Sequence, residues 1–233
     1  MPDDAGDDLD QLIRRVDPDR WLTSRFISDQ RARADVLALY AFDHELARAT
    51  RVASTQLLAE IRLTWWREAL DEIFAGGPVR RHPVAEALGE AVRRHNLPRE
   101  PLEAMIDGQI ETLDETSLDP AALLDWADAV EGSVARLTAQ VLDPAADPQA
   151  AAPAGRCWGL ALLRRSGRAP EPVIDPLLAA ALPGARRAAK ALGVAALPAA
   201  LPARLSRFDL AGRSPGVLGK QLALILASAT GRI

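Results

Sequence analysis

A chain of 233 residues, 48% of them hydrophobic, is long enough to bury one substantial core. The formal net charge of −4 argues against a general nucleic-acid-binding protein, because such proteins usually carry a basic surplus. The single cysteine, Cys157, excludes an intramolecular disulfide, and we expect it to be a small buried side chain in a reducing compartment.

The amino-terminal stretch MPDDAGDDLD is acidic and has neither the basic region nor the apolar run of a signal peptide. No apolar stretch in the sequence approaches the roughly 18 residues that a membrane-spanning helix needs. We therefore expect a cytoplasmic protein, and peripheral contact with the inner face of the cytoplasmic membrane stays an open alternative. We expect one domain over residues 1–233, in which residues 1–17 form an acidic amino-terminal segment.

Hydrophobic residues recur about every 3.6 residues along most of the chain, and no convincing alternating strand pattern is found. This periodicity predicts an all-α fold. In chain order, we expect helices at about 34–53, 56–74, 83–95, 98–112, 120–142, 156–165 and 216–229. Residues 143–155 are predicted to form a loop. The proline-rich carboxy-terminal third, residues 167–233, is predicted to contain short helices in an irregular order before the last helix.

The predicted helix at 56–74 is apolar on two sides. One stripe consists of Leu63, Trp66, Leu70 and Ile73, and the other of Leu58, Ile61, Trp65 and Ala69. Because a helix that is apolar on most sides is usually buried, we expect this helix inside a helical bundle, with both tryptophans in the core.

The segment YAFDHELARATR, residues 40–51, contains two acidic residues that could hold a metal ion. Asp43 and Glu45 are two residues apart, which separates their side chains by about 200° around a helix, so they cannot chelate one ion. We expect them to be solvent-exposed charges, with Glu45 close to Arg48. None of the three histidines has a partner at the spacing of a zinc site.

Four segments of the chain form a set of motifs. They are DRWLTSRFISDQRARADVLALYAFDHELA (residues 19–47), HPVAEAL (82–88), NLPREPLEAMIDG (96–108) and VEGSVARL (130–137). In order and spacing these segments resemble the squalene and phytoene synthase family over about residues 18–166. The resemblance implies an all-α, isoprenoid-synthase-type helical bundle. In the enzymes of this family, two aspartate-rich helices hold Mg²⁺ ions bound to prenyl diphosphates.

The positions that carry aspartates in the family are not acidic in this sequence. When YAFDHELA is aligned with the family motif, the first two aspartates fall on Ala47 and Arg51. A later aspartate falls on Ser166, and the family asparagine falls on Leu162. An arginine at the place of a Mg²⁺ ligand inverts the charge that the ion requires. The resemblance therefore implies no metal site and identifies no catalytic residue.

Two further motifs, AFDHELA at 41–47 and RLTWWREA at 62–69, resemble a phytoene-synthase-like subgroup related to a complex I assembly factor. Members of this subgroup lack the metal-binding aspartates. Membership implies a catalytically degenerate protein, an assembly or scaffold factor for respiratory complex I. Its expected partners are complex I subunits or other assembly factors, and no cofactor is expected.

Two alternatives remain open. The first is a head-to-head prenyltransferase of the phytoene or squalene synthase type, with Mg²⁺ as its cofactor. It would need at least three displaced acids around one cavity. The candidates are Asp43, Glu68, Asp71, Glu111 and Asp114.

The second alternative is a carrier of a prenyl or other lipid-like ligand. A diphosphate or another anion in the cavity would be held by arginines, because guanidinium groups match the geometry of phosphate oxygens. The residues expected to contact such a ligand are Tyr40, Arg51, Arg62 and Arg165.

Overall fold

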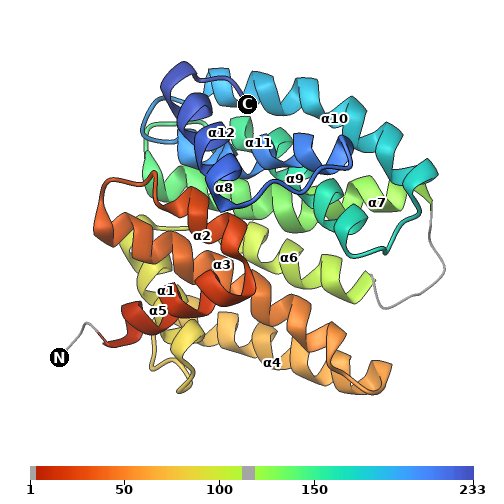
Figure 1. Ribbon diagram of the computed structural model, residues 1–233. Coiled ribbons are helices and arrows are strands. Elements are labelled where there is room, and N and C mark those ends of the chain that lie inside the picture. Colours follow the sequence, from red (N-terminus) through yellow and green to blue (C-terminus); the bar gives the residue numbers. More distant parts are fainter. Residues whose placement is uncertain (1–3, 112–118) are drawn as a thin grey trace. The chain divides into compact units, whose positions relative to one another are not determined.

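The computed structural model describes residues 4–111 and 119–233, with side chains from Asp8 onward in the first range (Figure 1). Within these ranges every regular element is helical, which confirms the all-α prediction. The chain divides into two compact units, Met1–Glu115 and Thr116–Ile233.

The first unit is built around α3. Its helices are α1 (Asp4–Val16), α2 (Pro18–Ser24), α3 (Gln30–Arg51), α4 (Gln56–Ala75), α5 (Pro83–His95) and α6 (Arg99–Glu111). α3 packs against each of the other five helices, and every residue from Val36 to Phe42 is buried. Asp29 fixes the start of α3, because its side chain accepts hydrogen bonds from the backbone N–H groups of Arg31 and Ala32. α3 is therefore the core helix of this unit.

The acidic amino-terminal segment is helical over most of its length. α1 begins at Asp4, and Leu9 and Ile13 of this helix are buried. These two residues are four apart and lie on one side of the helix, which contacts α3 and α5. Asp10 is half-buried and forms an ion pair with Arg33, so the acidic segment is part of a packed helix.

Of the two apolar stripes of α4, only one is buried throughout. The stripe that contains Leu63 and Trp66 is buried as predicted. In the second stripe Leu58 and Ile61 are exposed, so the expectation of a helix buried on both sides is wrong for this part of α4. Trp65 is half-buried, so only one of the two tryptophans lies fully in the core.

The second unit is built around α9. Its elements are α7 (Pro120–Ala127), the π-helical turn η1 (Asp128–Gly132), α8 (Ser133–Leu142), η2 (Pro148–Ala151), α9 (Ala152–Arg165), α10 (Glu171–Ala191), η3 (Leu197–Ala200), α11 (Leu201–Leu210) and α12 (Val217–Thr230). α9 contacts α7, α8, α10 and α11. It also crosses η1 closely, because a Cβ added at Gly155 would lie 2.2 Å from the backbone oxygen of Glu131. Only glycine fits at this crossing.

Two predictions for the second unit need correction. The predicted loop at 143–155 is too long, because η2 and the first turn of α9 lie within it. The region after residue 167 was predicted to hold only short helices before the last one, but it begins with a 21-residue helix, α10. Pro176 and Pro183 lie inside this helix. Ile174 and Leu178 are buried, and α10 packs extensively on α9. This packing offsets the backbone hydrogen bonds that the prolines remove.

The last helix, α12, matches its predicted position. Ala223, Leu224 and Ala227 are buried on the side that contacts α11. Among the residues that the structure describes, no helix is both long enough and apolar enough to cross a membrane.

Candidate functional site

A buried arginine joins α2 to α3 in the first unit. Arg20 is 3% exposed, and its Nη1 donates a hydrogen bond to Oδ2 of Asp43 at 2.6 Å. The same guanidinium lies 5.0 Å from the centre of the Tyr40 ring, which is within cation–π range. Asp17, the N-cap of α2, lies 3.7 Å from Nε of Arg20. Two carboxylates and one aromatic ring therefore surround this cation.

The prediction that Asp43 is a solvent-exposed charge is wrong. Its side chain is buried, because Arg20 reaches it from another helix and supplies a counter-ion. Glu45 is also less exposed than predicted, with 15% of its side chain exposed, but it forms the predicted ion pair with Arg48 at 3.2 Å. Tyr40 is buried beside Arg20, and its role as a ligand contact stays a prediction.

The α3 positions that are predicted to replace the family aspartates lie near the carboxyl end of the helix. Ala47 is half-buried, and Arg51, one turn later, is exposed and is the last residue of α3. Arg62, on the neighbouring α4, is also exposed. The charges of Arg51 and Arg62 are accessible to an anion from solvent, as the carrier alternative requires.

The corresponding positions in the second unit lie at the carboxyl end of α9. Leu162 is half-buried. Ser166 is exposed just after the last helical residue, and its Oγ donates a hydrogen bond to the carbonyl oxygen of Leu163 at 3.0 Å. A leucine and a helix-capping serine supply no carboxylate to a metal ion.

Arg165 is held by two neighbours within the second unit. Its guanidinium lies 4.3 Å from the ring centre of Trp158, and its Nε lies 3.2 Å from Oδ1 of Asp209. Asp209 balances the charge of Arg165, so an anionic ligand at this place would compete with a carboxylate.

The acidic residues that a Mg²⁺-dependent prenyltransferase would need do not form one cluster among the described residues. Glu68 and Asp71, on α4, each form an ion pair with an arginine, at 3.3 and 2.5 Å. Glu111 is exposed at the end of α6, and Asp114 lies outside the described residues. In the part of the chain that the structure describes, no three His, Cys, Asp or Glu side chains come together as a possible metal site.

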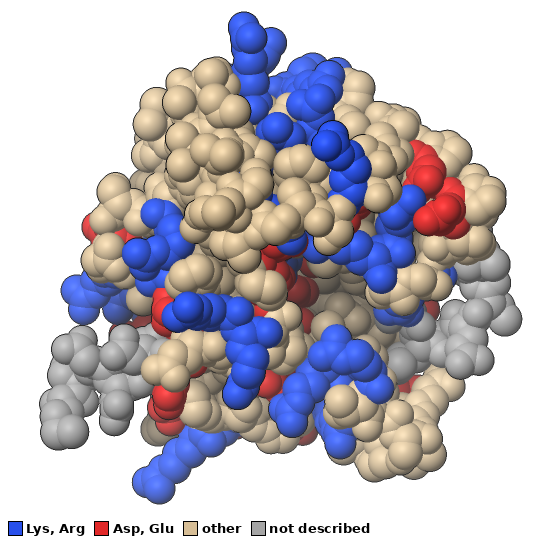
Figure 2. All heavy atoms as spheres, viewed as in Figure 1, with Lys and Arg blue, Asp and Glu red and all other residues tan. Residues whose placement is uncertain are grey.

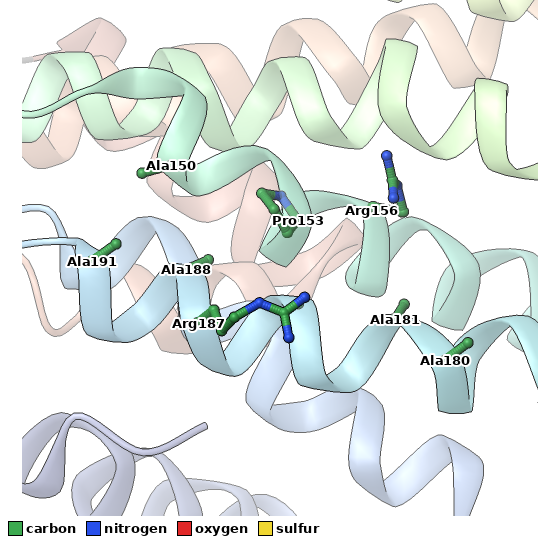
Figure 3. Close-up of a pocket in the computed structure, with 9 residues that line it drawn as sticks. Ala150, Pro153, Arg156, Ala180, Ala181, Arg187, Ala188 and Ala191 are labelled. Atoms are coloured by element: carbon green, nitrogen blue, oxygen red, sulfur yellow. The ribbon is translucent and has the colours of Figure 1, made fainter.

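A surface hollow of about 340 Å³ lies between the start of α9 and α10 (Figure 3). Five alanines and Pro153 line it, together with Gly184 and the arginines Arg156 and Arg187. Hydrogen bonds to Asp128 raise the pKa of Arg156 above its ordinary value, and the carboxylate balances the charge of the guanidinium. The hollow therefore offers a small apolar surface beside two exposed cations, Arg187 and the Asp128-paired Arg156.

Sequence reasoning missed both arginine partners, Asp43 for Arg20 and Asp209 for Arg165. Each pair joins residues that are distant in the chain, so no short motif contains both members. The hollow was also missed, because an alanine-rich helix face has no distinctive residue pattern. Of the expected ligand contacts, Tyr40, Arg51 and Arg62 belong to the first unit and Arg165 belongs to the second.

A family model described as squalene/phytoene synthase matches residues 13–166 of the chain. Curated relatives carry the name NADH dehydrogenase (ubiquinone) complex I, assembly factor 6. The bovine protein (Bos taurus) is 31% identical over 133 residues, which are 57% of this chain and 39% of the relative. The rat protein (Rattus norvegicus) is 31% identical over 160 residues, which are 67% of this chain and 47% of the relative. The chain thus spans less than half the length of these relatives.

Two solved structures have a similar fold. A dehydrosqualene synthase in complex with ligand superposes with a TM-score of 0.74 at 16% identity, over 97% of this chain and 95% of that one. The squalene synthase HpnC from Alicyclobacillus acidocaldarius superposes with a TM-score of 0.59 at 20% identity, over 97% and 94% of the two chains. These similarities confirm the isoprenoid-synthase-type fold and extend it into the carboxy-terminal third, where sequence motifs were not recognisable.

Proposed function

We propose that this chain, which belongs to the squalene/phytoene synthase family, does not catalyse prenyl transfer and acts as an assembly factor for respiratory complex I. One observation carries the proposal. By the motif alignment, Ala47 and Arg51 on α3, and Leu162 and Ser166 at the end of α9, occupy the positions of the family's aspartates and asparagine.

The chemistry of prenyl diphosphates explains why this observation matters. A leaving diphosphate is stabilised by Mg²⁺, and Mg²⁺ is bound by carboxylates and other oxygen ligands. The exposed guanidinium of Arg51 repels a divalent cation, and at the other positions alanine and serine cannot replace an aspartate, nor leucine an asparagine. Loss of the acids in both motifs favours a protein that keeps the fold without the reaction.

Similarity to the complex I assembly factors supports the proposed role. The bovine and rat proteins named assembly factor 6 are each 31% identical to this chain, over 57% and 67% of its length. The partners we propose are complex I subunits or other assembly factors, and the compartment we propose is the cytoplasm. No cofactor is required for this role.

The ligand carrier is the second candidate, and the exposed arginines favour it. Arg51 and Arg62 present accessible cations on neighbouring helices of the first unit. Such a carrier would bind an anionic lipid-like molecule without Mg²⁺. The Mg²⁺-dependent enzyme is disfavoured by the dispersal of Glu68 and Asp71 into separate ion pairs with arginines.

Deletion of the gene in its host tests the assembly role. We expect less fully assembled complex I on native gels, lower NADH oxidation by membranes, and accumulation of partial assemblies, all restored by the wild-type gene. A variant with Arg51→Ala and Arg62→Ala should restore assembly equally well if the arginines serve no ligand. Unchanged complex I in the deletion strain would contradict the proposal.

A further inference from the structure

One side of α12 is an uncovered apolar surface. Leu218, Leu222, Ile225 and Leu226 are between 52% and 76% exposed and follow the i, i+4, i+7, i+8 spacing of a single helix stripe. The opposite side, with Leu224 at its centre, is buried toward α11. We call the four exposed residues the α12 face. Figure 2 shows a continuous tan surface in the region of α12, with Lys and Arg spheres at its borders.

The chain next to the α12 face is basic. From Leu201 to Ile233, which covers α11 and α12, the sequence contains five Lys and Arg residues and one acidic residue, Asp209, which is paired with Arg165 at 3.2 Å. Arg213 precedes α12 by four residues and Arg232 follows it by two, and both are exposed. Four residues of extended chain span about 15 Å at most, so a basic side chain lies close to each end of α12.

We propose that the α12 face docks on an anionic lipid membrane surface. Its four aliphatic side chains enter the boundary between headgroups and acyl chains, and the surrounding Lys and Arg side chains contact lipid phosphates. α12 has 14 residues and is about 21 Å long, shorter than the roughly 30 Å hydrocarbon core, so it lies in the plane of the membrane.

The observations favour a membrane over two other occupants. A second copy of this chain would bring two basic surfaces together, which costs free energy through like-charge repulsion. A protein partner usually meets an interface rich in aromatic residues, whereas the α12 face contains only leucine and isoleucine. The inference is independent of the proposed function and holds for an assembly factor or a ligand carrier.

Flotation of the intact chain with lipid vesicles tests the proposal. We expect binding to vesicles of phosphatidylcholine with 30% phosphatidylglycerol, at least tenfold weaker binding to phosphatidylcholine alone, and about tenfold weakening in 0.5 M NaCl. Leu222→Gln with Leu226→Gln should lower binding to anionic vesicles about tenfold or more. The matched control, Leu57→Gln with Ile61→Gln, changes two exposed aliphatic residues of α4 and should bind as the wild type does.

A site-specific label gives a second readout that does not depend on weakened binding. Cys157 is fully buried, so an environment-sensitive fluorophore will react selectively with Leu222→Cys. We expect its emission to shift to shorter wavelength on addition of anionic vesicles, while a label at Leu57→Cys does not shift.

Four outcomes would overturn the proposal. The first is that the wild type stays unbound at low salt. The second is that Leu222→Gln with Leu226→Gln binds like the wild type. The third is a dimer in solution that these two substitutions dissociate, which would assign the α12 face to a second copy. Capture of a specific acidic protein, without vesicle binding, would assign it to that protein.

Discussion

The Arg20 guanidinium is enclosed by Asp43, Tyr40 and Asp17, so these groups stabilise its charge where water cannot reach it. Asp43→Asn should lower the free energy of unfolding by about 2–3 kcal/mol, because it removes the carboxylate that lies 2.6 Å from a buried cation. Urea denaturation measures this loss. Glu45→Gln removes the more exposed ion pair with Arg48 and should cost less than about 1 kcal/mol. Equal losses in the two variants would contradict this description of the cluster.

Cys157 shows the effect of burial on a thiol. Burial raises the pKa of Cys157 to about 12, from an ordinary value near 9. At pH 8 the folded chain should therefore resist iodoacetamide for hours, whereas the chain in urea should react fully. Because the folded pKa is the higher one, the contribution of this thiol to stability is fully present below pH 9. It is lost as the pH rises from about 9 toward 12. Rapid alkylation of the folded chain at pH 8 would contradict this prediction.

Residue burial was only partly predictable from sequence. The buried position of Cys157 follows from its chemistry and is confirmed. Asp43 was expected in solvent, because its counter-ion Arg20 is distant in the chain and belongs to no motif with it. Long-range ion pairs of this kind become visible only when the helices are placed.

The crossing of α9 over η1 depends on the absence of a side chain at Gly155. Gly155→Ala should lower the free energy of unfolding by about 2–3 kcal/mol, because its Cβ would lie 2.2 Å from the backbone oxygen of Glu131. Thermal unfolding monitored by circular dichroism measures the change. Gly77→Ala is the control, since a Cβ there meets nothing within 4 Å, and it should be neutral or slightly stabilising. An unchanged melting temperature for Gly155→Ala would show that the crossing can relax.

Helix positions were well predicted by periodicity, and helix surroundings were not. The helix at 83–95 was predicted to the residue, and the one at 56–74 to within one residue at its end. The same periodicity could not tell that Leu58 and Ile61 face solvent, because an apolar stripe does not say which neighbour covers it. α10 was missed, because the penalty of two internal prolines is offset by packing that the local sequence does not contain.

At the scale of the whole molecule, the fold and the family were accessible from sequence, and the proposed function rests on resemblance to other proteins. The motif set within residues 18–166 agrees with the family match to residues 13–166. The carboxy-terminal third lacks recognisable motifs but superposes with the rest on a dehydrosqualene synthase. A fold depends on packing contacts spread over many residues, so it tolerates many substitutions. A metal site depends on a few carboxylates, so a single substitution can abolish it.

The most direct test of the central claim is calorimetric titration of a non-hydrolysable farnesyl diphosphate analogue into the intact chain, with and without Mg²⁺. If Ala47, Arg51 and Ser166 replace the family acids, as the motif alignment predicts, Mg²⁺ should neither create nor strengthen binding. An active dehydrosqualene synthase serves as the positive control. Binding to this chain that is unaffected by Mg²⁺ would agree with a protein that has lost its metal site and would favour the carrier. Tight binding that requires Mg²⁺ would contradict the account and identify the chain as a prenyltransferase.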